Sequence, residues 1–334
     1  MPFDLAFIWA GLIAFAVLAY VILDGFDLGV GILFPFMRGE ADKDLAMNTI
    51  APVWDGNETW LVLGGGGLFA VFPLAYAVVM PALYVPIIVM LLALIFRGVA
   101  FEFRWRTKKG KFLWDISFTF GSVMAAFAQG IALGALVQGI AVEGRAYAGG
   151  HWDWLTPFSI LTGVALVGAY ALMGATWLVM KTDGPVRQVA RRMAMGAGAV
   201  TIVLVGLVSL ITPFLNPLYL DRWFGFPNVI FSAVVPIAIL GAAFIFVKGL
   251  RDNRDAWPFL ATIALFILSF IGLGISFYPY IVPPSLTIWD VAAPDESLWF
   301  LLVGALVLVP MILIYTGYAY WVFRGKVDPA GGYH

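Results

Sequence analysis

The sequence contains no cysteine and only two histidines, His151 and His334, among 334 residues. The missing cysteines exclude disulfides, thiolate metal sites, iron–sulfur clusters and cysteine nucleophiles. Haem and zinc sites depend on His or Cys, and one of the two histidines is the last residue. We therefore expect no metal and no cofactor to be ligated by this chain.

Charged residues are also scarce, because Asp, Glu, Lys and Arg make up 12% of the chain while 62% is hydrophobic. The mean hydropathy is +0.96. Soluble domains have about 25% charged residues, and a water-exposed surface cannot be built from so few. The sequence therefore predicts an all-α integral membrane protein. The net charge of −1 argues against a nucleic-acid partner.

Nine stretches are apolar over about 20 residues, the length that a membrane helix needs. We expect residues 1–334 to form a single polytopic membrane domain without a soluble part. The predicted spans are Leu5–Met37, Glu58–Ala77, Val79–Phe103, Ile116–Ala141, Thr156–Met180, Ala194–Phe214, Val229–Leu250, Pro258–Val282 and Leu298–Phe323.

The boundary between the second and third spans is the least distinct, because no charged residue separates Glu58 from Arg97. A single helix over this interval would be about 57 Å long, which is too long for a hydrocarbon core of about 30 Å. Two helices fit, with a break in the interval from Phe72-Pro73 to Met80-Pro81.

The basic residues predict the orientation of the chain. With nine spans, 17 of the 19 Lys and Arg residues fall at one side of the membrane, and only Arg145 and Arg222 fall at the other. Cytoplasmic connections are enriched in Lys and Arg. We therefore expect the N-terminus outside and the C-terminus in the cytoplasm. Merging the second and third spans would worsen the division to 15 against 4.

Two pairs of acidic residues lie near the predicted cytoplasmic surface. Asp24 and Asp27 are three residues apart in the first span, and Asp55 and Glu58 are three apart where the second begins. Residues at this spacing share a helix face. An ionisable group at the centre of a span costs about 2.5–3.5 kcal/mol, so such groups indicate function. We expect these four carboxylates to form the entrance of a proton path.

The third predicted span ends at the same side and carries Arg97, Glu102 and Arg104. These residues predict a charge network with the acidic pairs. The alternative is purely structural: the two arginines would neutralise Asp24, Asp27 or Glu102 and lock three helices together. For Asp55 and Glu58, the structural alternative is capping of a helix N-terminus.

Glycines accompany these motifs. Gly25, Gly29 and Gly31 are expected to let another helix backbone come close to the first span. The run Gly64-Gly65-Gly66-Gly67 lacks the Lys-Ser/Thr that follows a phosphate loop. We expect it to form a close helix crossing.

Three ordered motifs, at residues 24–31 (DGFDLGVG), 50–61 (IAPVWDGNETWL) and 96–104 (FRGVAFEFR), resemble subunit II of cytochrome bd-type quinol oxidases. Length and hydropathy match over the whole chain. The resemblance implies nine membrane helices, arranged as two four-helix bundles plus a peripheral helix, in the bacterial cytoplasmic membrane. Some relatives have Asp where this chain has Glu102, and the relatively short chain suits the cyanide-insensitive branch.

The resemblance also implies a division of labour between two chains. Subunit I carries the two b haems, haem d and the quinol site, and it transfers electrons to O2, which is reduced to water with cytoplasmic protons. Subunit II carries no haem. In this chain Asp55 and Asp24 would line a proton path toward subunit I, and Trp54 would contact the structural quinone that some members hold. A small single-helix accessory subunit and membrane lipid are further implied partners.

Two other functions compete with this one. Intramembrane carboxylates and Gly-interrupted helices also fit a proton-coupled secondary transporter. Transporters, however, place their site near the midplane between repeats, whereas the acidic residues here are off-centre and confined to the first three spans. The third alternative is a structural scaffold that has no role in proton transfer.

Overall fold

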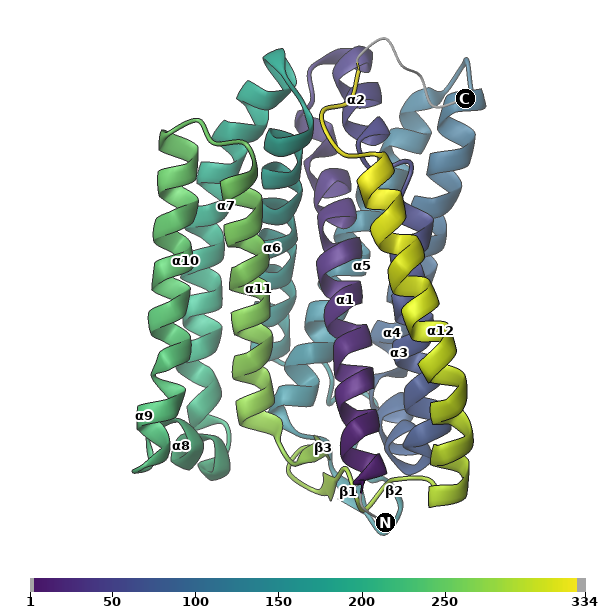
Figure 1. The fold of residues 1–334 in the computed structure, drawn as a ribbon, viewed down its shortest axis with the longest axis vertical. Coiled ribbons are helices and arrows are strands. Elements are labelled where there is room, and N and C mark those ends of the chain that lie inside the picture. The colour runs from purple at the N-terminus through teal and green to yellow at the C-terminus, as the bar shows by residue number, and fades with distance from the viewer. Residues whose placement is uncertain (1–2, 329–334) are drawn as a thin grey trace.

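The computed structural model describes residues 3–328, which form a bundle of long helices with two small hairpins at one end (Figure 1). Nine of the described helices have 18 residues or more. The elements are α1 (Leu5–Leu33), η1 (Phe34–Phe36), α2 (Gly39–Asn48), α3 (Trp54–Val71), α4 (Pro73–Arg106), α5 (Lys111–Gln138), β1 (Val142–Glu143), β2 (Ala146–Tyr147), α6 (Pro157–Lys181), α7 (Gly184–Ile211), η2 (Thr212–Phe214), α8 (Pro217–Phe224), α9 (Asn228–Ser232), α10 (Val234–Arg251), α11 (Ala256–Phe277), β3 (Tyr280–Val282), β4 (Leu286–Thr287) and α12 (Asp295–Val322). His334 lies outside the described residues.

Each of the nine predicted spans contains one long helix, and eight of these helices are long and apolar enough to cross a membrane. The helix that does not meet this criterion is α3. Its 18 residues begin with a polar turn that holds Asp55, Asn57 and Glu58, and they include the run Gly64–Gly67. The same polar residues that suggest function therefore lower the hydropathy of α3.

The expected break between the second and third spans is confirmed at Phe72. This residue leaves the helical region, with φ −124° and ψ 63°, and Pro73 begins α4. Pro81 and Pro86, by contrast, lie inside α4 without ending it. Proline at the first turn is tolerated because its missing N–H has no helical partner there.

Several predicted boundaries differ from the observed ones. The first helix ends at Leu33, and a 3-10 turn that contains Pro35 follows. The eleventh helix ends at Phe277, and residues 280–282 form a strand instead. Helix α7 begins at Gly184, ten residues before the predicted Ala194, so a basic stretch expected in a connection is helical. At α7 the helix continues beyond its apolar part, which is all that hydropathy detects. At the ends of α1 and α11 the reverse holds, because apolar residues continue into a 3-10 turn and a strand.

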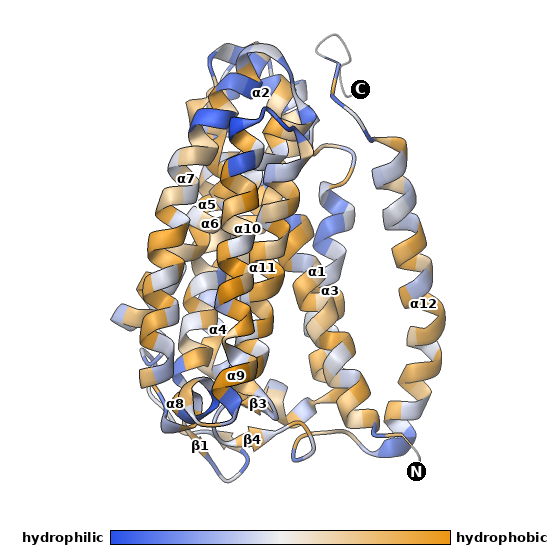
Figure 2. Cartoon of the chain, turned by 60° about the vertical axis from the view of Figure 1, so that its left-hand side comes forward, coloured by the Kyte–Doolittle hydropathy of each residue, from blue (hydrophilic) through white to orange (hydrophobic). Residues whose placement is uncertain are grey.

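Helix α1 lies at the centre of the packing, with α3, α5 and α6 against it. The other close pairs are α4 with α5, α6 with α7, α10 with α11, and α11 with α6. Helix α12 stands apart from this body over most of its length (Figure 2). It is attached mainly near its ends, where Trp9 donates to the Leu298 carbonyl and the Tyr320 hydroxyl donates to Asn57.

The close approach of α1 and α6 depends on two glycines that face each other. A Cβ atom at Gly29 would lie 2.0 Å from the carbonyl oxygen of Tyr170, and one at Gly174 would lie 2.2 Å from the Gly29 backbone. Gly31 is equally confined, because its Cβ would lie 1.9 Å from Ser122 Oγ. The prediction that glycines in α1 admit a second backbone is therefore confirmed.

The four consecutive glycines of α3 serve a close crossing at only two of their positions. Cβ atoms at Gly64 and Gly67 would lie 3.3 Å from Val17 and Ile13 of α1. At Gly65 and Gly66 a Cβ atom would meet nothing within 4 Å, so these residues face outward.

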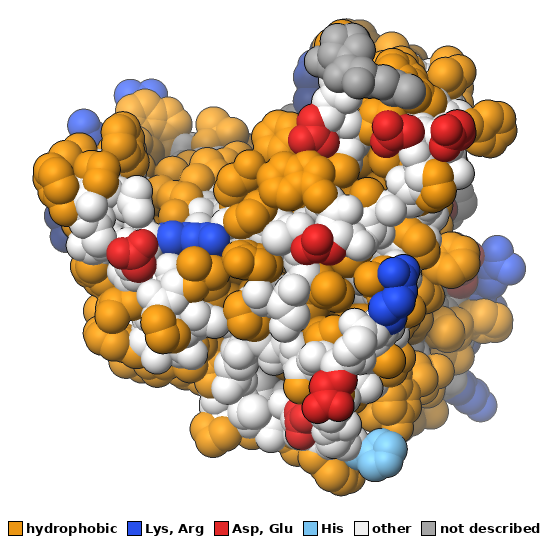
Figure 3. All heavy atoms as spheres, turned by 90° about the horizontal axis from the view of Figure 1, so that it is seen from below, with side chains coloured by type: hydrophobic (Ala, Val, Ile, Leu, Met, Phe, Trp, Pro, Cys, Tyr) orange, Lys and Arg blue, Asp and Glu red, His pale blue; other side chains and the backbone are white. Residues whose placement is uncertain are grey.

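The two ends of the bundle differ in charge. We call the end with Leu5 the N side and the end with Val322 the C side (Figure 1). A view onto the N side shows mainly hydrophobic and uncharged groups, with few Lys and Arg side chains (Figure 3). Strands β1 to β4 lie on this side, and α2 lies on the C side.

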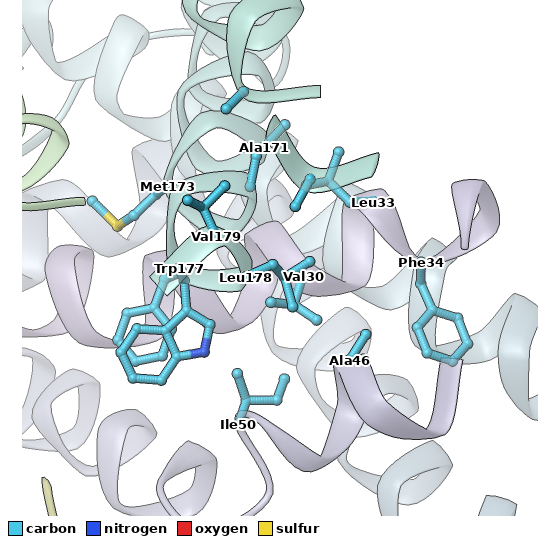
Figure 4. Close-up of a cluster of buried hydrophobic side chains, with 14 of the residues drawn as sticks. Val30, Leu33, Phe34, Ala46, Ile50, Ala171, Met173, Trp177, Leu178 and Val179 are labelled. Atoms are coloured by element: carbon cyan, nitrogen blue, oxygen red, sulfur yellow. The ribbon is translucent and has the colours of Figure 1, made fainter. Parts of the chain in front are cut away.

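A large apolar cluster fills the C-side half between α1, α2 and α6 (Figure 4). At its centre the rings of Phe26 and Trp177 stack, with centroids 4.1 Å apart. The surrounding side chains include Val30, Leu33, Phe34, Ala46, Ile50, Ala171, Met173, Leu178 and Val179. Trp54 packs against this cluster and lies beside the Arg97 guanidinium, so the cluster forms an apolar wall next to Arg97.

The segment after α12 is fastened to the C side of α6 and α11. Lys181 donates to the Phe323 carbonyl oxygen, and Lys326 forms ion pairs with Asp183 and Asp255. These contacts hold the C-side end of α12 on the body even though the middle of the helix is exposed.

We expect Gly29→Ala to destabilise the protein by about 1–3 kcal/mol or more, because the new methyl group would overlap backbone atoms of α6. Gly11→Ala in the same helix is the matched control, since nothing lies within 4 Å of its Cβ. Thermal unfolding in detergent measures both, and equal melting temperatures would contradict the prediction.

The fastening of the C-terminal segment should depend on pH. Burial favours a higher pKa for Asp255, but hydrogen bonds from Lys326 and Arg187 outweigh it and hold that pKa below its ordinary value of 3.8. Bonds to Asp183 and Asp255 raise the pKa of Lys326 above its ordinary 10.5. The Asp255 contribution is lost as pH falls through its lowered pKa, and the Lys326 contribution is lost as pH rises through its raised pKa.

The protection factors of the backbone amides in residues 323–328, which compare the measured exchange rate with the intrinsic rate at the same pH, should therefore be high at neutral pH and lower at both extremes. Lys326→Ala should lower the protection at neutral pH, whereas Lys108→Ala, which changes an exposed lysine that forms neither of these ion pairs, should not. Protection that is the same in wild type and Lys326→Ala would refute this role.

Candidate functional site

The side chain of Arg97 is completely buried on the C side of the bundle and is surrounded by three carboxylates. Its Nη1 atom lies 2.9 Å from Asp24 Oδ1 and 2.5 Å from Glu58 Oε1. Its Nη2 atom lies 3.9 Å from Asp27 Oδ2. We call Arg97, Asp24, Asp27 and Glu58 the Arg97 cluster.

Three helices bring the Arg97 cluster together. Asp24 and Asp27 are on one face of α1, Glu58 is in the second turn of α3, and Arg97 is in the C-side part of α4. Glu58 is the opening of the cluster, because 25% of its side chain is exposed while the other side chains are at most 1% exposed.

Asn57 connects the cluster to α12. Its amide donates to Asp27 Oδ2 at 2.7 Å and to the Leu23 carbonyl at 3.1 Å, and its oxygen accepts from the Tyr320 hydroxyl at 2.9 Å. Asn57 is 1% exposed. The peripheral helix is thus attached to the site through a buried hydrogen bond.

Four buried polar atoms of the cluster have no hydrogen-bond partner among the described residues: Asp24 Oδ2, Asp27 Oδ1, Arg97 Nε and Arg97 Nη2. Buried polar groups without a protein partner are normally satisfied by ordered water. The cluster therefore offers the donors and acceptors that a short internal water chain needs.

A second cluster surrounds Arg104, two helical turns further along α4. Its guanidinium is also completely buried and contacts three carboxylates, of which Asp115 lies 2.6 Å from Nε. The remaining members are Glu40, Asp44, Lys43 and Lys111. We call these six residues the Arg104 cluster.

The two clusters differ in their balance of charge. The Arg104 cluster has three cations and three carboxylates. The Arg97 cluster has one cation and three carboxylates. Carboxylates that share too few cations in a buried site cannot all be ionised at low cost, so they titrate together. The Arg104 cluster is suited to holding helices, and the Arg97 cluster is suited to holding and exchanging protons.

The remaining predicted site residues lie outside the Arg97 cluster. Asp55 and Glu102 are exposed and form no ion pair within residues 3–328. Of the four carboxylates expected at the entrance and Glu102 beside them, only Asp24, Asp27 and Glu58 therefore converge on Arg97. Arg104 neutralises residues of α2 and α5, and not the Asp24, Asp27 or Glu102 of the structural alternative.

Trp54 belongs to the packing around Arg97. Its ring stacks on Phe101 with centroids 5.0 Å apart, and the Arg97 guanidinium lies 5.9 Å from its centre. A Cβ atom at Gly98 would lie 3.4 Å from this ring. The indole is half-buried, so one edge of it stays accessible.

Sequence reasoning missed Asn57, Tyr320 and the acidic partners of Arg104. Asn57 could have been identified from the sequence, because an amide buried in an apolar helix needs a hydrogen-bond partner. Asp115 could have been identified as well, since it lies near the start of an apolar helix. Tyr320 could not, because aromatic residues are common near the ends of membrane helices.

Comparison with known proteins explains why these motifs occur together. Residues 5–323 match the family of cytochrome bd terminal oxidase subunit II. The chain belongs to this family. It is 31% identical to the cytochrome bd-I ubiquinol oxidase subunit 2 of Escherichia coli, over 97% of this chain and 95% of that protein. It is also 31% identical to the cytochrome bd ubiquinol oxidase subunit 2 of Bacillus subtilis, with 96% of each chain covered.

The fold agrees with this membership. The bd oxidase structure from Geobacillus thermodenitrificans superposes with a TM-score of 0.78, covering 96% of this chain and 99% of that chain at 20% identity. This subunit II is accordingly a multi-pass protein of the bacterial inner membrane, and its family implies a subunit I as partner.

Removing the cation of the Arg97 cluster should be severely destabilising. Arg97→Gln leaves three carboxylates near one another in a low-dielectric site, and breaking a buried ion pair in this way costs about 3–5 kcal/mol. Adding Asp24→Asn should restore part of the loss. The exposed Arg192, which forms no ion pair within residues 3–328, provides the matched control Arg192→Gln. Thermal unfolding of the purified complex is the measurement, and an unchanged melting temperature for Arg97→Gln would refute the prediction.

Proposed function

We propose that this chain is the haem-free subunit of a membrane quinol:O2 oxidoreductase and that it supplies a cytoplasmic proton-uptake path to the haem-bearing subunit I. The observation that carries the proposal is the Arg97 cluster, in which three carboxylates share one buried cation beside a partly exposed Glu58. The relatives are subunits of ubiquinol oxidases by name. Reduction of O2 to water consumes protons, so such a complex needs a route for them.

The proposed topology has nine crossings, with the N-terminus outside and the C-terminus in the cytoplasm. Counting α3 as a crossing supports this number, because its 18 residues extend about 27 Å. An odd number is also consistent with the start of α1 and the end of α12 lying at opposite ends of the bundle (Figure 1). In this proposal α1, α3, α4 and α5 would form one four-helix bundle and α6, α7, α10 and α11 the second, with α12 peripheral; the close pairs α4 with α5, α6 with α7 and α10 with α11 support it. We treat residues 1–334 as one membrane domain.

The proposed absence of haem in this chain follows from its side chains. Cysteine is missing, and the described histidine, His151, is in the exposed connection between α5 and α6. Within residues 3–328 no group of three His, Cys, Asp or Glu side chains can hold a metal ion. The two b haems and haem d would therefore be ligated by subunit I, where electrons reach O2.

The proposed path begins at the cytoplasmic surface with Asp55, which is exposed in the first turn of α3. Glu58, one turn further along the same helix, would pass protons to Asp24 and Asp27. A structural quinone would meet this chain at the accessible edge of Trp54. Membrane lipid and a small single-helix subunit complete the proposed partners.

The experiment is to express the whole oxidase with Glu58→Gln or Asp55→Asn and to measure quinol-driven O2 consumption. We expect turnover to fall by about tenfold or more, because each change removes a proton-carrying group. The reduced-minus-oxidised spectrum should show that the haems are still assembled. Glu102→Gln is the matched control, since Glu102 is exposed at the same end and forms no ion pair with the described residues.

If both variants keep full turnover and intact haem spectra, the proton path is refuted, and this chain would act only as a structural scaffold. Haem bands that stay with this chain after subunit I is removed would refute the haem-free assignment. The transporter alternative predicts proton-coupled uptake by the isolated chain in liposomes, and membership in the oxidase family disfavours it.

A further inference from the structure

The three carboxylates of the Arg97 cluster are not held equally by its single cation. Arg97 Nη1 donates to Asp24 Oδ1 at 2.9 Å and to Glu58 Oε1 at 2.5 Å. Asp27 Oδ2, in contrast, lies 3.9 Å from Arg97 Nη2, which is too far for a hydrogen bond. Asp27 is therefore the carboxyl group that the guanidinium neutralises least.

Solvent does not replace the missing hydrogen bond from a cation at Asp27. The Glu58 side chain is 25% exposed, whereas the Asp27 side chain is completely buried. A carboxylate that leaves water stays ionised at low cost only when a cation and hydrogen bonds compensate for the lost solvent. Asp24 has the bond from Arg97 and Glu58 has both that bond and water, so Asp27 is the costliest of the three to ionise.

The charged groups around Asp27 add to this cost. Arg97 of α4 is the one cation of the cluster, and the carboxylates of Asp24 on α1 and Glu58 on α3 share it. A third negative charge beside two others would be repelled by both, because like charges interact strongly where water is excluded. Protonating one carboxyl group relieves this repulsion, and the preceding comparison identifies that group as Asp27.

Asn57 determines which oxygen of Asp27 carries the hydrogen. The Asn57 amide nitrogen lies 3.1 Å from the Leu23 carbonyl oxygen, which can only accept, so the orientation of the amide is fixed. The same nitrogen donates to Asp27 Oδ2 at 2.7 Å. Since Oδ2 accepts this bond, the hydrogen belongs on Asp27 Oδ1, a buried atom with no hydrogen-bond partner within residues 3–328.

Tyr320 of α12 supports this orientation from the other side. Because the amide nitrogen of Asn57 faces Leu23 and Asp27, its oxygen is left to accept from the Tyr320 hydroxyl at 2.9 Å. The amide oxygen is thereby satisfied in a site where Asn57 is 1% exposed. Asn57 is therefore a positioning residue for Asp27, and Tyr320 holds Asn57 in place.

We propose that Asp27 is the proton-holding residue of the Arg97 cluster: its carboxyl group is neutral in the resting oxidase, with the proton on Oδ1, while Arg97 keeps Asp24 and Glu58 ionised. This inference rests on the proposed proton path and names the residue that stores the proton. In the transfer step the O–H bond at Asp27 Oδ1 breaks and a water molecule on that side takes the proton. A proton that enters at Glu58 then neutralises Asp27 again, so one proton enters for each that leaves.

The test is the infrared spectrum of the whole purified oxidase at neutral pH. A protonated carboxyl group has a carbonyl-stretching band that is separate from the bands of ionised carboxylates. Difference spectra between wild type and variant cancel the bands of lipid esters and of subunit I. We expect Asp27→Asn to lose the band of one carboxyl group. Asp27→Glu keeps an acid at this position and should displace the band instead of removing it.

Asp115→Asn is the matched control. Asp115 is a buried aspartate on the same side of the bundle, but Arg104 and Lys43 both donate to it at 2.6 Å, so it is ionised and has no such band to lose. If Asp27→Asn loses no more of the band than Asp115→Asn does, the assignment is refuted.

Asp27→Glu distinguishes a proton on Asp27 from a proton on a neighbour. Asp27→Asn removes a negative charge as well as an acid, and this change could release a proton held by Asp24. Asp27→Glu leaves the number of acids unchanged, so a band that belongs to Asp24 would stay at its position. A band that is not displaced in Asp27→Glu therefore refutes the proposal, also when Asp27→Asn does not assemble.

The infrared result and the turnover measurements fail separately. An undisplaced band together with slow turnover of Glu58→Gln refutes only the assignment to Asp27 and leaves the proton path intact. A displaced band together with normal turnover of Glu58→Gln and Asp55→Asn refutes the proton path. The proton on Asp27 is then part of a neutralised buried site, and its transfer to water is refuted with the path.

Discussion

The burial of the Arg97 guanidinium is the constraint on which the C-side half of the structure depends. A cation at this depth is stable only when carboxylates surround it, and α1 and α3 supply these carboxylates. Asp27, one of the carboxylates around Arg97, also accepts a hydrogen bond from Asn57. Asn57 in turn accepts one from Tyr320, which attaches α12. One ion thus joins α4 to α1 and α3, and Asn57 extends this network to α12.

The two buried arginines of α4 differ in the balance of positive and negative charge around them. Arg97 and Arg104 are seven residues apart, so they lie on one face about 10 Å from each other along the axis. The Arg104 cluster is balanced and ties α2 to the start of α5. The Arg97 cluster has an excess of carboxylates and is bordered by an apolar wall. Low dielectric on that side strengthens each electrostatic interaction.

Close helix packing is the second condition for the site. The contact between Gly29 and Gly174 brings the backbones of α1 and α6 together. Beside this contact, Gln129 of α5 donates to the Tyr20 hydroxyl of α1, and the Tyr170 hydroxyl of α6 donates to Gln129. The glycines therefore bring together elements whose polar side chains meet.

The sequence by itself determined the membrane class, the approximate positions of the long helices, the interval that holds the break between α3 and α4, and the family, because hydropathy, proline and short motifs are local properties. Only the structure placed that break at Phe72. The sequence also indicated that Asp24 and Asp27 matter, since buried charge is rare. Only the tertiary structure decided that Glu58 joins them while Asp55 remains exposed. It alone paired Tyr320 with Asn57, which are 263 residues apart. Such contacts leave no local pattern, because they depend on how helices pack and turn about their axes.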